Sequence, residues 1–137
     1  MRANEISVGD WVYCTFSDKP CKVLGIEEYE DTGYANVKVT NVVGAKDIAS
    51  LTPIPLTVEL LEKNDFVKFI AGQHILSKRD DNYFLSIFTD LSTAPNSNGK
   101  MAVCVKNGYT DAKIAITYLH ELQHVLKLCG INKELTA

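Results

Sequence analysis

The fold is most constrained by a succession of short runs of β-branched and aromatic residues, separated at close spacing by turn residues. In the first fifty residues such runs begin at Trp11, Cys21 and Tyr34, and a further short run lies around residues 48–51. This composition favours strands, and the intervening Gly, Pro, Asn and Asp favour turns. Gly25, inside the second run, is a candidate bulge. The pattern predicts a small, curled barrel of SH3-like type.

A short helix is expected after this barrel. Pro53 and Pro55 indicate an extended connector, because a proline disfavours helical backbone in the residue before it. Thr57 is a good N-cap for a helix over residues 58–63, which Asn64 would close.

The chain then returns to strand-like runs, at residues 66–70, 74–77, 83–88 and 101–106. The apolar residues near the C-terminus have helical spacing, and Gly130 is a favourable residue just past a helix end. Periodicity leaves open whether this helix begins near Ala112 or near Thr117. The predicted fold class is therefore α+β and strand-dominated, with an SH3-like barrel over residues 1–52 and an antiparallel sheet packed with a C-terminal helix over residues 53–137. One continuous compact domain is the alternative.

Bulk properties exclude several classes of protein. The chain has 137 residues and a net charge of −3, which argues against a general nucleic-acid or anionic-membrane surface. It shows neither an apolar signal region nor a stretch long enough to span a membrane, so we expect a cytoplasmic protein. The four cysteines form no C-x-x-C pair and are expected to be buried, reduced thiols. A disulfide between Cys14 and Cys21 across the intervening turn is a less favoured alternative.

The segment His120-Glu121-Leu122-Gln123-His124 has the H-E-x-x-H spacing of zinc peptidases. In those enzymes both histidines bind one metal ion and the glutamate acts as general base. A zinc-dependent peptidase with ligands His120 and His124 and base Glu121 is therefore an alternative function.

The rest of the chain weighs against this zinc site. Lys127 and Gly130 stand where the longer metzincin motif needs glycine and histidine. Glu134 lies in a tail expected to be frayed, and His74 would have to reach the site from a strand. On a helical wheel the histidines lie opposite an apolar stripe, so we expect them on a solvated face or on one that grazes a polar surface. That stripe consists of Leu119, Leu122, Val125, Leu126 and Cys129.

Aromatic residues of the first half offer a binding surface. Trp11, Tyr13 and Tyr34, together with Phe16, could line a peptide groove of the SH3 kind. A core position for Trp11 in so small a barrel is the favoured interpretation. The acidic segments 27–31 and 80–82 lack the spaced ligands of a calcium loop and are expected to be solvated loops and turns.

Several strings resemble a family of small uncharacterised proteins from Bacteroides-type bacteria and their phages or mobile elements. The matching strings are Arg2-Ala3-Asn4-Glu5, Gly9-Asp10-Trp11-Val12, Pro53-Ile54-Pro55-Leu56-Thr57, Leu60-Leu61 leading to Phe66, and Tyr118-Leu119-His120-Glu121-Leu122-Gln123. In that family the helix keeps the positions of His120, Leu122 and Gln123 but has amides in place of Glu121 and His124. The resemblance implies a family that is not built around zinc, and it supplies no substrate.

The sequence thus predicts a non-enzymatic binding or accessory protein of phage or mobile-element origin that recognises a protein partner. The candidate binding residues are Trp11, Tyr13, Tyr34, His120 and Gln123. No catalytic residue, metal or cofactor is assigned, with zinc held by the H-E-x-x-H segment as the alternative. Nucleic-acid binding through the barrel is a second alternative. The identity of the partner and the oligomeric state are left open.

Overall fold

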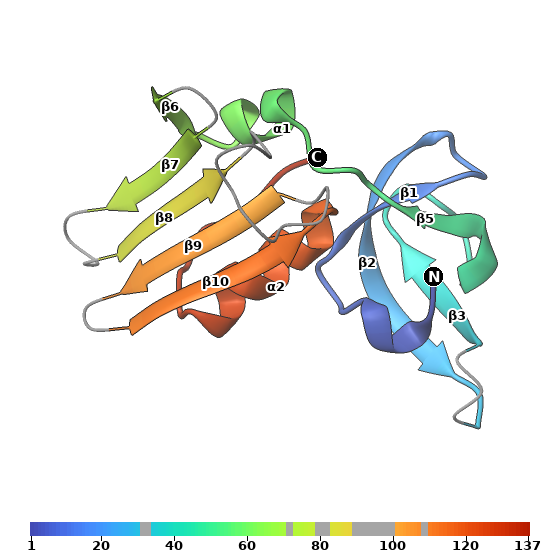
Figure 1. The fold of residues 1–137 in the computed structure, drawn as a ribbon. Helices are drawn as coiled ribbons and strands as arrows, with labels where there is room; N and C mark the ends of the chain where they lie inside the picture. Colours follow the sequence, from blue (N-terminus) through green and yellow to red (C-terminus); the bar gives the residue numbers. More distant parts are fainter. Residues whose placement is uncertain (31–33, 71–72, 79–82, 89–100, 108–109) are drawn as a thin grey trace. The chain divides into compact units, whose positions relative to one another are not determined.

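The computed structural model describes residues 1–30, 34–70, 73–78, 83–88, 101–107 and 110–137 (Figure 1). The chain divides into two compact units. Unit 1 comprises Met1–Pro55 with Tyr118–His120 and Ala137, and unit 2 comprises Leu56–Thr117 with Glu121–Thr136. The fold is strand-dominated α+β, as predicted. Within the described residues, no helix is long and apolar enough to cross a membrane.

Unit 1 is built on a five-stranded antiparallel sheet with strand order β4-β3-β2-β1-β5. Its elements are the 3-10 helix η1 (Ala3–Glu5), β1 (Trp11–Cys14), β2 (Lys19–Glu28), β3 (Ala35–Val39), β4 (Lys46–Asp47), the 3-10 helix η2 (Ile48–Ser50) and β5 (Leu51–Pro53). The register of β2 against β3 shifts between Val23 and Gly25, which confirms the expected irregularity at this glycine.

The core of unit 1 follows from the alternation of its strands. Successive residues of a strand point to opposite faces of the sheet. In β1 the buried residues are Val12 and Cys14, while Trp11 and Tyr13 are only partly buried. The inward residues of the neighbouring strands complete one apolar cluster, which includes Cys21, Val23, Ala35, Val37, Val39, Ile48 and Leu51. Trp11 therefore does not occupy the core position that its size suggested, because its place in the strand alternation puts it on the other face.

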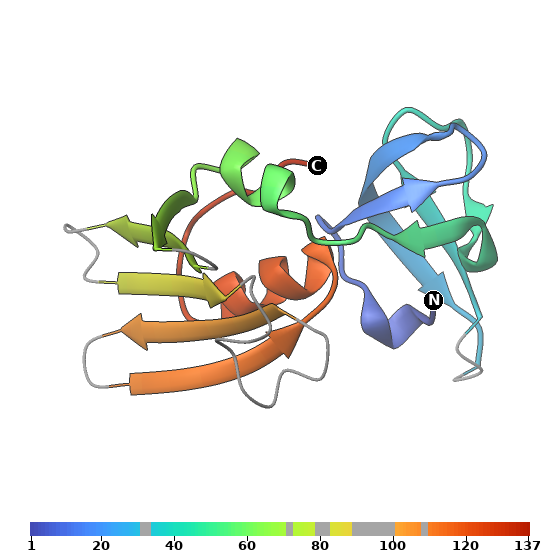
Figure 2. The same cartoon turned by 45° about the horizontal axis from the view of Figure 1, so that its top comes forward.

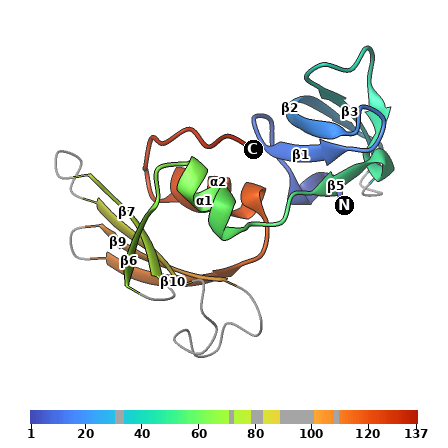
Figure 3. The same cartoon turned by 90° about the horizontal axis from the view of Figure 1, so that it is seen from above.

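Unit 2 is a five-stranded antiparallel meander, with strand order β10-β9-β8-β7-β6, and the C-terminal helix packs against it (Figure 2). Its elements are α1 (Val58–Lys63), β6 (Val67–Ile70), β7 (Gln73–Lys78), β8 (Tyr83–Phe88), β9 (Met101–Asn107), β10 (Thr110–Ile116) and α2 (Leu119–Leu128), of which the first two residues count with unit 1. Ala112 lies in β10, so the helix begins only after Thr117. Both helices lie on the same face of the sheet, as Figure 3 shows.

The predicted N-cap of α1 is confirmed, since the Thr57 hydroxyl oxygen accepts a hydrogen bond from the Leu60 N–H at 3.2 Å. Its end is a Schellman motif. The N–H of Asp65 donates to the carbonyl oxygen of Glu62, and that of Phe66 donates to the carbonyl oxygen of Leu61. Asp65 has φ 69°, so an aspartate occupies the left-handed position that glycine usually takes.

Helix α2 ends with the same motif. Gly130 has φ 70°, as its predicted place just past the helix requires. Its N–H donates to the carbonyl oxygen of Lys127, and the Ile131 N–H donates to that of Leu126. Ile131 and Leu126 are both buried, which supplies the apolar contact that accompanies such ends.

The C-terminal tail is docked, so the expectation that it frays was wrong. Leu135 is 2% exposed, and the backbone of Thr136 is bonded to the Asn64 side chain. Lys133 forms an ion pair with Asp65. The tail is ordered because α1 ends in side chains that bind it, which helical periodicity alone does not reveal.

Candidate functional site

The outer face of β1 carries two aromatic residues two positions apart. Trp11 and Tyr13 point to the same side of the sheet, opposite to Val12 and Cys14. Directly across the ladder, Lys22 and Pro20 of β2 face Trp11 and Tyr13 respectively, and Thr52 of β5 also pairs with Tyr13. We call this surface, formed by Trp11, Tyr13, Pro20, Lys22 and Thr52, the β1 aromatic face.

A hydrogen bond fixes the Tyr13 side chain. Its hydroxyl donates to the Asp18 carboxylate, which lies five residues further on in the β1–β2 turn. Asp18 has φ 52°, a left-handed conformation that aspartate tolerates better than most residues. This hydrogen bond is the main reason why the pKa of Tyr13 is raised above its ordinary value, with burial and the negative charge of Asp18 adding to it. Tyr13 is therefore a neutral phenol held in one position.

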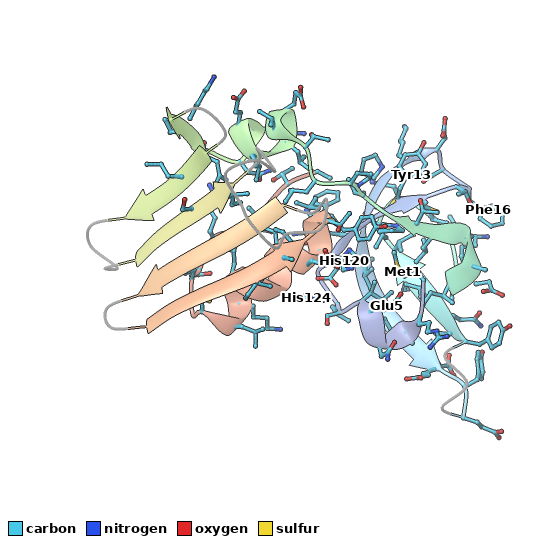
Figure 4. The ribbon with its side chains drawn as sticks, viewed as in Figure 1. Met1, Glu5, Tyr13, Phe16, His120 and His124 are labelled. Carbon is cyan, nitrogen blue, oxygen red and sulfur yellow. The ribbon has the colours of Figure 1, made fainter. Side chains whose placement is uncertain are left out.

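Two lysines lie over aromatic rings of unit 1. The Lys22 Nζ atom is 5.7 Å from the centroid of a Trp11 ring, and the Lys46 Nζ atom is 4.8 Å from that of Phe16. Both distances are within the range of cation–π attraction. Phe16 is 67% exposed and sits in the turn that follows β1, beyond Tyr13 (Figure 4). Sequence reasoning did not foresee the roles of Asp18 and Lys22, because the conformation of the turn brings Asp18 to Tyr13 and the strand register brings Lys22 to Trp11.

Tyr34 does not join the β1 aromatic face. It lies at the end of the β2–β3 hairpin, where its carbonyl oxygen accepts the Tyr29 N–H at 3.1 Å. Along β2, Trp11 is paired with Lys22, and the strand runs on for six residues to Glu28, where the hairpin to β3 begins. At ~3.3 Å per residue, Tyr34 is about 20 Å along β2 from the tryptophan. The structure therefore brings together Trp11 and Tyr13 but leaves Tyr34 at a separate, exposed place.

The H-E-x-x-H segment occupies the first turns of α2 (Figure 4). His120 is only 5% exposed, so the expectation that it lies on a solvated face was wrong. Its ring stacks on that of Tyr118, with centroids 5.8 Å apart and an angle of 9° between the planes. The helical wheel misplaced His120 because it shows only the residues of the helix itself, whereas the burial of this side chain depends on what packs around the first turn of α2.

Glu121 has a backbone partner. Its carboxylate accepts the Thr117 N–H at 2.6 Å, a contact that satisfies a donor just before the helix and suits the positive end of the helix dipole. His124 and Gln123 are half-buried on later positions of the same helix. The glutamate thus has a structural role at the helix start that is sufficient to explain its presence.

The acidic segments and His74, which the sequence analysis weighed as metal ligands, lie as follows. Glu27 and Glu28 are strand residues of β2, paired with Asn36 and Ala35, and not part of a loop. Residues 80–82 lie outside the described part of the chain, as does the side chain of His74, whose backbone pairs with Ile87. In the part that the structure describes, no three His, Cys, Asp or Glu side chains gather in a way that could hold a metal ion.

Comparisons of the chain with models of known protein families, with curated proteins and with solved structures gave no match.

Proposed function

We propose that the protein is a non-enzymatic binding protein whose unit 1 is an SH3-like barrel that recognises a partner protein through the β1 aromatic face. The strand order of unit 1 supports this fold, since β1 lies between β2 and the late strand β5. A 3-10 helix between β4 and β5 and the irregularity in β2 are further features of a small, curled barrel.

Contacts between distant segments support the curling of the sheet. The β1–β2 turn is bound to η2, because both the N–H and the hydroxyl of Thr15 donate to the carbonyl oxygen of Ser50, at 3.0 and 2.9 Å. In the same turn, Phe16 lies under Lys46 of β4. The turn after β1 thus contacts both ends of the β4–η2 segment.

The observation that carries the proposed function is the pair of outward, half-exposed aromatic rings at Trp11 and Tyr13. Tryptophan and tyrosine dominate binding energy at protein interfaces, since each combines a large apolar area with a polar group and few rotatable bonds. Asp18 holds Tyr13 in place before any partner arrives, so little side-chain entropy is lost on binding. Two aromatic rings beside a proline on a strand suit an extended, proline-containing segment of the partner.

Trp11 is the single tryptophan of the chain and therefore reports directly on this surface. Peptides selected from a random displayed library against the full chain should quench or shift its emission in a saturable titration. Tyr13→Ala should weaken the selected peptides at least tenfold, in line with the loss of an interface hot spot. Val43→Ser, at a residue that is 94% exposed in the β3–β4 connection, is the matched control and should bind as the unchanged chain does.

Two results would contradict the proposal. Peptides that bind equally well to Tyr13→Ala and to the unchanged chain would show that the β1 aromatic face is not the binding surface. A single-stranded oligonucleotide that quenches Trp11, with an affinity that falls steeply with salt, would point to a nucleic-acid-binding module. The resemblance to phage and mobile-element proteins supports an accessory role in the cytoplasm of a bacterial host.

A further inference from the structure

The β1 aromatic face consists of two cross-strand pairs that differ in charge. Trp11 of β1 is paired with Lys22 of β2, and Tyr13 is paired with Pro20. Of the five residues that define the face, Lys22 alone carries a charge. The face therefore has a cationic half around Trp11 and an uncharged half around Tyr13.

The strand ladder holds Lys22 in a defined place. Its backbone N–H donates to the Thr40 Oγ1 atom at 2.9 Å, and its carbonyl oxygen accepts a hydrogen bond from the Thr40 N–H, also at 2.9 Å. On the outer surface the Lys22 Nζ atom lies 5.7 Å from the centroid of a Trp11 ring, and this cation–π contact keeps the ammonium group beside the ring. The half-buried lysine is therefore part of the surface that a partner covers.

The other end of the face lies beside a negative charge. The Asp18 carboxylate is held at the Tyr13 end, where it accepts the hydrogen bond from the Tyr13 hydroxyl. An acidic group of a partner is thus repelled at the Tyr13 end and attracted at the Trp11 end, whereas a basic group meets Lys22 as a like charge. The face therefore discriminates between partner segments by the position of a carboxylate.

The dimensions of the face set the spacing of the groups that it can bind. Trp11 and Tyr13 are two residues apart on one strand, so the two halves of the face lie ~7 Å apart. An extended, proline-rich segment rises ~3.1 Å per residue. When the proline of such a segment packs on Tyr13 and Pro20, a side chain two or three residues away reaches Lys22.

We propose that Lys22 is the specificity-determining residue of this face, and that the partner segment carries an aspartate or glutamate two or three residues from its proline. This inference rests on the proposed function, since it names the chemistry of the partner that the β1 aromatic face binds. A single lysine matches a single carboxylate of a protein segment. A nucleic acid, by contrast, presents a phosphate at each nucleotide, which the net charge of −3 disfavours.

The test uses the full chain and dodecapeptides with a fixed central proline, selected from a displayed library. The tightest binder is synthesised with Glu, Gln or Lys at each position two or three residues from the proline, and Trp11 emission gives the affinities. At one of these positions the Glu peptide should bind about three- to fivefold more tightly than the Gln peptide, the size expected of a partly exposed ion pair. The Lys peptide should bind more weakly than either, and added salt should reduce the differences.

Substitutions assign this preference to Lys22. Lys22→Gln should bind the Glu and Gln peptides equally, and Lys22→Glu should prefer the Lys peptide. Lys22→Arg should keep the preference for Glu, because a guanidinium group also carries a positive charge and stacks on an aromatic ring. Lys38→Glu is the matched control, since it makes the same change of net charge at an exposed residue of β3 that is paired with Gly25. Circular dichroism checks that each variant is folded.

The results that contradict the inference are distinct from those that contradict the proposed function. Peptides that need Tyr13 for binding but show no preference for Glu over Gln overturn the inference and leave the proposed function intact. A loss of the preference in Lys38→Glu as complete as in Lys22→Glu also overturns it, since net charge is then the cause. Binding that is the same in Tyr13→Ala as in the unchanged chain overturns both.

Discussion

The side-chain amide of Asn64 is paired with the backbone of Thr136 through two hydrogen bonds. Its Nδ2 atom donates to the Thr136 carbonyl oxygen at 2.8 Å, and its Oδ1 atom accepts the Thr136 N–H at 2.7 Å. The same amide nitrogen donates to the Leu60 carbonyl oxygen at 2.8 Å at the end of α1. One buried side chain thus closes a helix and also holds the C-terminal tail of unit 2.

Replacing Asn64 with alanine should destabilise unit 2 by about 1–2 kcal/mol, because three partly buried hydrogen bonds to the backbone of Thr136 and Leu60 are lost. Urea denaturation followed by circular dichroism gives this value, and limited proteolysis should show earlier cleavage of the tail. Thr136→Ala is the matched control, since Thr136 contributes only backbone atoms to the pair. Equal losses in both variants would mean that the paired amide is not what holds the tail.

Gly130→Ala should lower the free energy of unfolding by about 1–2 kcal/mol, the cost of a left-handed conformation for a residue with a Cβ atom. Nothing lies within 4 Å of the added Cβ, so the effect reports on backbone conformation alone. Gly25→Ala is the comparison, since its backbone is not left-handed and its Cβ would meet only the Lys38 Cβ, at 4.0 Å. Chemical denaturation of both variants should rank Gly130→Ala as the less stable.

Substitutions of Glu121 separate a capping role from a catalytic one. Glu121→Gln keeps an oxygen that accepts the Thr117 N–H and should change stability little, whereas Glu121→Ala should cost about 0.5–2 kcal/mol, as the loss of a helix cap does. Thermal unfolding measures both variants. If the chain cleaves a peptide substrate and Glu121→Gln abolishes that cleavage, the carboxylate acts as a base and the capping interpretation is insufficient.

The titration of Tyr13 should depend on Asp18. Its pKa is raised in the folded protein, chiefly because the phenol donates a hydrogen bond to the Asp18 carboxylate. Stabilisation from this bond is therefore present below the ordinary pKa of 10.0 and is lost as pH rises through the higher folded-state value. NMR titration of ring-labelled tyrosine should place the Tyr13 transition at higher pH than in Asp18→Asn. Coincident titrations in the two proteins would exclude the hydrogen bond as the cause.

Local signals of the sequence predicted the helices well. Thr57, Asn64 and Gly130 act at helix ends through their own backbone and side-chain geometry, which short-range rules describe. The first four strands of the unit 2 sheet were likewise predictable as short apolar runs bounded by turns, whereas β10 was not, because periodicity left open whether its residues from Ala112 on are strand or helix.

Features that depend on which elements meet were not predictable in this way. His120 lies on the polar side of a helical wheel but is buried, because the wheel does not show what packs at the start of α2. Trp11 suggested a core residue, yet the strand alternation places Val12 in the core instead.

The pairing order of the strands has a consequence for the speed of folding. In unit 2 every strand pairs with its neighbours along the chain, so each pairing joins strands that follow one another directly in the sequence. In unit 1, by contrast, β5 pairs with β1, so that Val12 lies opposite Pro53. Closing this long loop costs more conformational entropy than pairing strands that follow one another in the chain. We therefore expect unit 1 to acquire its protected amides later than unit 2 in a pulse-labelling hydrogen-exchange experiment.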